Sequence, residues 1–249
     1  MSVKIKKEIR EFEILLRSVP SPIIALFAIS VIVMNLLANK SLELPFDWLA
    51  LDCGIIVSWV SFLSMDIITK HFGAKASTEI SLFAVILNLL TCGILLVAGS
   101  IPGVWGESYV EGSEAIINTA LDNTFSGTWY ILFGSTVAFV LSAVVNNFLN
   151  AMIGKLIKKE NSFKAYAVRS YISTAFGQFT DNLTFSLIVS HFFFGWTLLQ
   201  CVTCSLTGMV VELLCEVLFS PIGFRVCRKW RSEKIGEEYF RLKNGSVTK

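Results

Sequence analysis

The chain has 249 residues, of which 54% are hydrophobic and 16% are charged, and its mean hydropathy is +0.66. Soluble domains carry charge on about a quarter of their residues, so this composition excludes an ordinary soluble protein. The formal net charge is +2, and the basic residues form no patch that indicates a nucleic-acid partner. The composition therefore predicts an all-α integral membrane protein.

In chain order, residues 1–20 form a basic, amphipathic segment that we place in the cytoplasm. Residues 21–220 follow as a six-helix transmembrane domain, because a bilayer core of about 30 Å needs about 20 helical residues. The predicted spans are 21–38, 47–68, 79–100, 129–153, 169–190 and 196–219. The last two are joined by a tight turn near Phe194–Gly195, and residues 221–249 form a basic cytoplasmic tail.

The distribution of basic residues sets the predicted orientation. Twenty of the 21 lysines and arginines precede span one, follow span six, or lie between spans two and three or four and five. The opposite side carries only Lys40, and residues 101–128 are acidic, with Glu107, Glu111, Glu114 and Asp122. Short loops rich in lysine and arginine stay in the cytoplasm during insertion, so both termini are expected there.

The histidines and cysteines indicate no metal site and no enzyme. Cys201 and Cys204 have the spacing of a redox or zinc pair, but no second pair or histidine cluster accompanies them. His71 and His191 both lie near span ends. The sequence also lacks a His-Glu-x-x-His motif and a glycine-rich phosphate loop, so we expect no catalysis, no cofactor and no metal.

Polar residues inside the spans are informative because lipid cannot satisfy them. In span five, Ser170, Thr174, Gln178 and Asp181 fall within about a third of the helix circumference at about 100° per residue. Asp181 follows Arg169 by 12 residues, about 18 Å at helical rise, which is close to mid-bilayer. A carboxylate there costs about 2.5–3.5 kcal/mol, so we expect Asp181 to face a polar cavity between helices.

Other spans contribute further polar positions. Glu212 lies on the polar face of span six, Asn146 and Asn150 share a stripe of span four, and Asp66 ends span two. The predicted binding residues are Asp181, Gln178, Glu212, Asn146, Asn150, Asp66, Arg169, Thr174 and Ser170. Two structural alternatives stay open. Small polar residues can serve helix packing, and an internal salt bridge with Arg169 or Lys70 can hold Asp181.

Two motifs carry a resemblance to a known family. The segment Phe62–Ala76 contains Asp-Ile-Ile-Thr and then Phe-Gly, and the segment Arg169–Asn182 reads Arg-Ser-x-x-Ser-Thr-x-x-Gly-Gln-x-x-Asp-Asn. With the six-span plan and the length, they resemble the queuosine precursor transporter family, also called the vitamin uptake transporter (VUT) family. The family usually has an acidic residue at Lys70, a tyrosine at Phe72 and a hydroxyl residue at Asn182, so the chain resembles a divergent member.

The resemblance implies a transporter of the bacterial inner membrane that imports a small nucleobase-like molecule, a queuosine precursor or queuine. These are 7-deazaguanines, whose edge offers adjacent N–H and NH2 donors to a carboxylate. Two other functions stay open: a substrate-binding membrane subunit of a vitamin importer that a partner ATPase module energises, and a passive channel or scaffold. A homo-oligomer also stays open.

Overall fold

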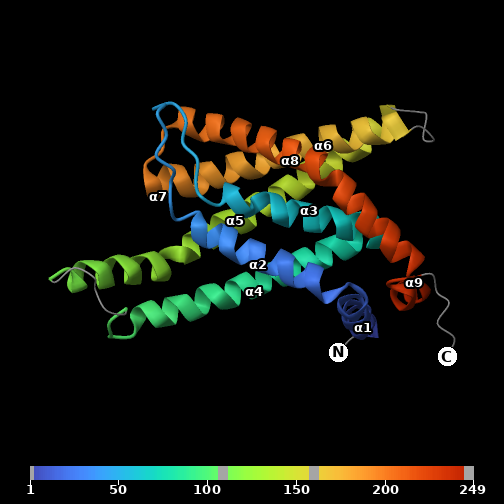
Figure 1. The fold of residues 1–249 in the computed structure, drawn as a ribbon, viewed down its shortest axis with the longest axis horizontal. Coiled ribbons are helices and arrows are strands. Elements are labelled where there is room, and N and C mark those ends of the chain that lie inside the picture. Colours follow the sequence, from blue (N-terminus) through green and yellow to red (C-terminus); the bar gives the residue numbers. More distant parts are fainter. Residues whose placement is uncertain (1–2, 106–111, 157–162, 244–249) are drawn as a thin grey trace. The chain divides into compact units, whose positions relative to one another are not determined.

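The computed structural model describes residues 3–105, 112–156 and 163–243, apart from the side chains of residues 3, 4, 147, 150, 151, 154–156, 163–170, 216 and 220. These residues form helices and one isolated β-bridge, which confirms the predicted all-α class for this part of the chain. The helices are α1 (Val3–Ser18), α2 (Ser21–Leu37), α3 (Ile55–Phe72), α4 (Ala74–Ser100), α5 (Glu114–Leu156), α6 (Phe163–Phe185), the π-helix η1 (Ser186–His191), α7 (Phe192–Phe194), α8 (Leu198–Ser232) and α9 (Glu237–Lys243) (Figure 1).

Within the described residues, four helices are long and apolar enough to cross a membrane. They are α3, α4, the part Glu114–Asn146 of α5 and the part Leu198–Phe219 of α8. A fifth is counted if α1 and α2, which meet at 103°, form one bent span. The protein is therefore a multi-pass membrane protein with four or five candidate spans. The predicted fifth span, 169–190, is covered by α6 and η1 but is not one of these candidates, so the six-span topology stays a prediction.

The chain divides into two compact units. Unit 1 comprises Met1–Ile32, Val57–Asn88 and Glu216–Lys249. Its core joins Leu15 of α1, Ile68 and Phe72 of α3, and Trp230 of α8. The Phe72 ring, which is 1% exposed, stacks on Phe240 of α9 with ring centroids 5.7 Å apart. Aromatic packing therefore holds the short helix α9 on the end of α3.

The candidate span in α8 ends at Phe219, where span six was predicted to end, but the helix itself runs further, and the tail 221–249 stays a prediction. α8 continues through Pro221 to Ser232, because the residues beyond the proline pack into the core of unit 1. Cys227 is 4% exposed, and its Sγ donates to the carbonyl of Ile67 at 3.6 Å. A proline inside a membrane helix is tolerated where its surroundings satisfy the freed backbone groups, so it marks no helix end here.

Unit 2 comprises Val33–Ile56 and Leu89–Cys215, and within it α5 and α6 pack side by side (Figure 1). Glycines let the backbones approach. A Cβ atom on Gly134 of α5 would overlap the side chain of Val189 in η1, and one on Gly177 of α6 would lie 3.1 Å from Cβ of Asn146.

The turn predicted near Phe194–Gly195 is confirmed. Gly195 has a φ of 70°, in the left-handed region that favours glycine, and the N–H of Trp196 donates to the carbonyl of Ser190 at 3.1 Å. This turn joins η1 and α7 to α8, and the two segments lie in contact, since the Sγ of Cys201 in α8 donates to the carbonyl of Ser186 in η1 at 3.5 Å.

The segment before α3 is not helical, although residues 47–54 were predicted as the start of span two. α3 begins at Ile55. The preceding loop instead packs on the first turns of α8, where Gln200 Nε2 donates to the carbonyl of Asp47 at 3.0 Å. Thr203 Oγ1 likewise lies 2.7 Å from the carbonyl of Trp48. These side-chain bonds to the loop backbone replace a helical turn at this end of unit 2.

The predicted outer loop 101–128 is also partly helical, since α5 begins at Glu114. Trp105 holds this extension. Its backbone N–H donates to Asn118 Oδ1 and its indole N–H to Asp122 Oδ1, both at 2.5 Å. α5 has 43 residues, about 64 Å at helical rise, and therefore extends well beyond the bilayer core.

Candidate functional site

Several polar residues of unit 2 lie where α6 contacts α5 and α8. Thr174, Gln178 and Asp181 recur at intervals of three and four residues, which places them on one face of α6. Gln178 is 4% exposed, and the other two are partly buried. The predicted shared face of span five is therefore the face that α6 turns into the protein.

One contact joins α6 to α8. Asn182 Nδ2 donates to Glu212 Oε2 at 3.2 Å, and Glu212 is 4% exposed. Gly208 lies one helical turn before Glu212, and a Cβ atom there would be 2.8 Å from Asn182 Nδ2. The absence of a side chain at Gly208 therefore makes room for the Asn182 amide beside Glu212.

A second contact joins α6 to α5. The carboxylate of Asp181 lies beside the hydroxyl of Ser142, which can donate to it. Ser142 Oγ also lies 3.0 Å from the carbonyl of Phe139. A serine hydroxyl has one proton, so it cannot donate to both acceptors at once. Asp181 therefore keeps most of its acceptor capacity for another donor.

Among the residues that the structure describes, two amide oxygens at this place are buried without a hydrogen-bond partner, Gln178 Oε1 and Asn146 Oδ1. An unpaired buried acceptor costs about 1–3 kcal/mol, which a ligand with N–H groups can recover. We call Asn146, Gln178, Asp181, Asn182 and Glu212 the acceptor cluster. With two carboxylates and two unpaired amide oxygens, it is suited to a ligand that is rich in donors or positively charged.

Of the other predicted binding residues, one belongs to unit 1 and three have side chains outside the described residues. Asp66 belongs to unit 1, where it forms an ion pair with Lys70 one turn further along α3. Lys70 is the residue named above as an alternative partner of Asp181. The side chains of Asn150, Arg169 and Ser170 lie outside the described residues, so their roles stay predictions.

Sequence reasoning did not include Asn182 and Ser142 among the predicted binding residues. Ser142 lies one turn before Asn146 on the polar stripe of α5, and Asn182 is the last residue of the second motif. Both signals were visible in the sequence. What it could not show is which face of α5 or α8 each residue meets.

A further carboxylate of unit 2, Asp52, lies just before α3 and outside the candidate spans. Burial raises the pKa of Asp52 to about 6, although the N–H of Gly54 donates to its Oδ1 at 2.7 Å. Cys201 and Cys204 are free and buried. Among the residues that the structure describes, no group of three or more His, Cys, Asp or Glu side chains is arranged to hold a metal ion.

The fold and the acceptor cluster define a multi-pass helical membrane protein with a polar interior. Residues 52–226 match the family described as "Putative vitamin uptake transporter". The match covers more than half of the chain, so the chain belongs to this family, and the resemblance drawn from the two motifs is confirmed. The family is one of small-molecule transporters and not a class of enzymes. No curated protein and no solved structure matches the chain.

Proposed function

We propose that this protein imports a 7-deazaguanine, a queuosine precursor or queuine, across a bacterial inner membrane. Family membership supports the transport role. The acceptor cluster supports the substrate class, because its two carboxylates and two unpaired amide oxygens call for a ligand with several N–H donors.

In this proposal Asp181 accepts the ring N–H and the exocyclic NH2 of the guanine-like edge, as a carboxylate can accept two parallel hydrogen bonds. Gln178 can donate its amide NH2 to the ring carbonyl while its Oε1 accepts another N–H, since an amide has both a donor and an acceptor end. Glu212, which Asn182 orients, favours a positively charged substituent. The bound molecule is thus a neutral or cationic deazaguanine held by its donor edge.

The proposed topology has six spans with both termini in the cytoplasm, which the 20-to-1 distribution of basic residues supports. On this topology Asp181 lies near the middle of the bilayer, where a substrate site can open alternately to either side.

The experiment uses a bacterial host that can neither make nor import queuosine precursors. The chain is expressed, a precursor or queuine is supplied, and queuosine in the host tRNA is measured. We expect the wild type to restore queuosine. Asp47→Asn, which changes the charge of an exposed loop by the same amount as Asp181→Asn changes the charge of the site, should restore it too. No queuosine, despite confirmed membrane expression, would overturn the proposal. Restoration only together with an ATPase module would identify the chain as a binding subunit.

A further inference from the structure

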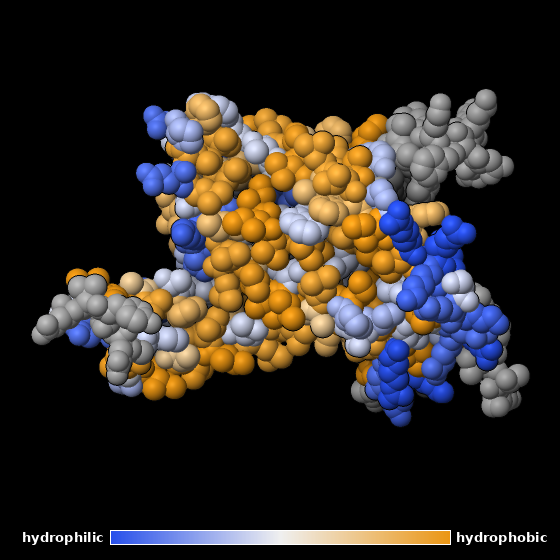
Figure 2. Space-filling model, viewed as in Figure 1, coloured by the Kyte–Doolittle hydropathy of each residue, from blue (hydrophilic) through white to orange (hydrophobic). Residues whose placement is uncertain are grey.

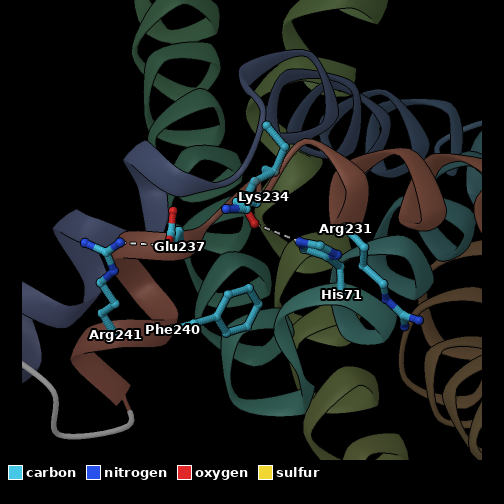
Figure 3. A pocket seen from close by; sticks show the side chains of 7 residues that line it. His71, Arg231, Lys234, Glu237, Phe240 and Arg241 are labelled. Carbon is cyan, nitrogen blue, oxygen red and sulfur yellow. Dashed lines mark hydrogen bonds and ion pairs between the residues drawn. The ribbon is translucent and has the colours of Figure 1, made fainter.

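Unit 1 contains a pocket of about 510 Å³ between the end of α3 and the elbow from α8 to α9 (Figure 3). Its charged lining is mostly basic. Arg231, Lys234 and Arg241 are cationic, and among the described lining residues Glu237 is the one acidic side chain. Glu237 is already paired with Arg241 at 2.7 Å. The pocket therefore has an excess of positive charge.

The elbow that shapes this pocket is fixed by its backbone. Lys234 has a φ of 55° and Gly236 a φ of 83°, both in the left-handed region. A Cβ atom on Gly236 would overlap the Phe72 ring, so this position requires glycine. The N–H of Ile235 donates to the carbonyl of Trp230 at 2.9 Å. The basic side chains thus project from a constrained turn.

His71 links α3 to this elbow, as Figure 3 shows. Its Nε2 lies 2.9 Å from the carbonyl of Ile235, and because a carbonyl only accepts, Nε2 is the donor. The other ring nitrogen, Nδ1, is buried and has no hydrogen-bond partner in the part of the chain that the structure describes. His71 therefore ties the end of α3 to the elbow that carries the basic side chains of the pocket.

A stripe along α8 leads into the pocket. Val217 and Phe224 are 50% and 64% exposed, and Arg228 and Arg231 are also exposed. These four residues, spaced by seven, four and three positions, lie on one side of the helix. The candidate span in α8 ends at Phe219, so the stripe runs from the lipid region to the pocket. Along α8, the apolar residues of the stripe come before the basic ones. This is the order expected where a helix leaves the lipid and its charged side chains reach the membrane interface.

Within unit 1, the surface in Figure 2 also passes from apolar to hydrophilic residues. Hydrophilic residues gather on the face formed by α1, α9 and the end of α8, next to the apolar surface of α8. A ligand that satisfies both parts must have an anionic head and an apolar tail.

We propose that this pocket binds the phosphate of an anionic phospholipid, with the acyl chains along Val217 and Phe224. Arginine fits phosphate oxygens with two parallel hydrogen bonds, and basic pockets at helix ends hold lipid headgroups. Free phosphate offers the same oxygens to the basic side chains but makes no contact with the apolar residues of the stripe. The proposal is independent of the transported substrate.

The test titrates the purified full chain in detergent with phosphatidylglycerol, phosphatidylcholine or inorganic phosphate and follows thermal unfolding and lipid retention in native mass spectrometry. The pocket variant is Arg231→Gln, Lys234→Gln and Arg241→Gln. The matched control is Lys6→Gln, Lys7→Gln and Arg10→Gln on α1, which removes three exposed charges, one of them also paired four residues away with a carboxylate.

We expect phosphatidylglycerol to bind more tightly than phosphatidylcholine. The pocket variant should lose about a hundredfold in affinity, at about fivefold per basic residue, and the α1 control much less. Phe224→Ser should weaken lipid binding without unfolding, since its side chain is exposed. Equal losses of lipid affinity in both triple variants would show that the lipid is held only by general electrostatic attraction to the protein. That result would overturn the proposed site. Binding of inorganic phosphate as tight as that of the lipid would overturn the lipid as its ligand. If the triple variant does not fold, Arg231→Gln and Lys234→Gln singly decide.

Discussion

Asn182 of α6 donates a hydrogen bond to Glu212 of α8 at 3.2 Å, and Gly208 leaves the space for it. The bond has two consequences. It holds a buried carboxylate in a defined orientation, and it joins the two helices that flank the turn at Gly195. Polar contacts between membrane helices contribute on the order of 0.6–2 kcal/mol each to stability. The contribution of this pair to the stability of unit 2 is therefore measurable.

Replacing the donor by a carboxylate tests this contact. Asn182→Asp places two carboxylates at hydrogen-bonding distance, and we expect it to lower the free energy of unfolding by about 1–3 kcal/mol. Adding Glu212→Gln restores a donor and an acceptor in reversed order and should recover most of the loss. Thermal unfolding of both single variants and the double variant in detergent gives the coupling energy. Purely additive losses would show that the two side chains do not interact.

The close approach of α5 and η1 predicts a second pair of coupled substitutions. Gly134→Ala should destabilise the protein by about 1–3 kcal/mol, because its Cβ atom would overlap Val189, which is 0% exposed. Val189→Ala leaves a small cavity and also destabilises, but the double variant should lose less than the sum. Gly93→Ala is the control, since no atom lies within 4 Å of its Cβ position. A harmless Gly134→Ala would contradict this packing.

The buried carboxyl group of Asp52 should make the stability of the protein depend on pH. Its pKa is raised from 3.8 to about 6 by burial, so the folded state holds this proton more tightly than the unfolded state. Stability should therefore fall as pH rises from about 4 to above 6, by at most about 3 kcal/mol at about 1.4 kcal/mol per pKa unit. Asp52→Asn cannot ionise and should remove that loss. Unfolding curves of both proteins at pH 4.5 and 7.5 measure it. Parallel pH profiles would contradict a buried Asp52.

The proposed orientation is tested by labelling in intact cells. In a background without the six native cysteines, a cysteine at Ser113 should react with a membrane-impermeant thiol reagent, because the acidic segment before α5 is predicted to lie outside. A cysteine at Ser232, the end of α8, should react only after the membrane is opened. Labelling in the opposite order would reverse the topology.

Much of the fold could be predicted because each part had a local signal. Apolar runs located the helices, Gly195 marked the last turn, and the two motifs identified the family. The boundaries failed where tertiary contacts override local signals. Pro221 reads as a helix stop, yet Cys227 and Trp230 bury the turns beyond it. Trp105 holds the first turns of α5 through bonds to residues 13 and 17 positions along the chain, which helical periodicity does not predict.

The candidate site was predictable in part for the same reason. Helical periodicity grouped Gln178 with Asp181, because both lie on α6. The partners of Asp181 and Asn182 lie on other helices, and the choice of Ser142 and Glu212 depends on which faces pack together. Asp66, like Asp181, is a carboxylate in a predicted span, but it pairs with Lys70 on its own helix. Sequence spacing alone does not decide between such an ion pair and a binding role.

Substrate binding to the Asp181→Asn variant tests the central proposal most directly. Binding of a 7-deazaguanine and of its analogue without the exocyclic amine is measured on the purified wild type, on Asp181→Asn and on the exposed control Asp47→Asn. We expect the wild type and Asp47→Asn to bind the full ligand and to bind the analogue about 5- to 150-fold more weakly, because a buried acceptor left unpaired costs about 1–3 kcal/mol. Asp181→Asn should lose this discrimination together with most of its affinity. Unchanged affinity and discrimination in a folded Asp181→Asn protein would contradict the proposed role of Asp181.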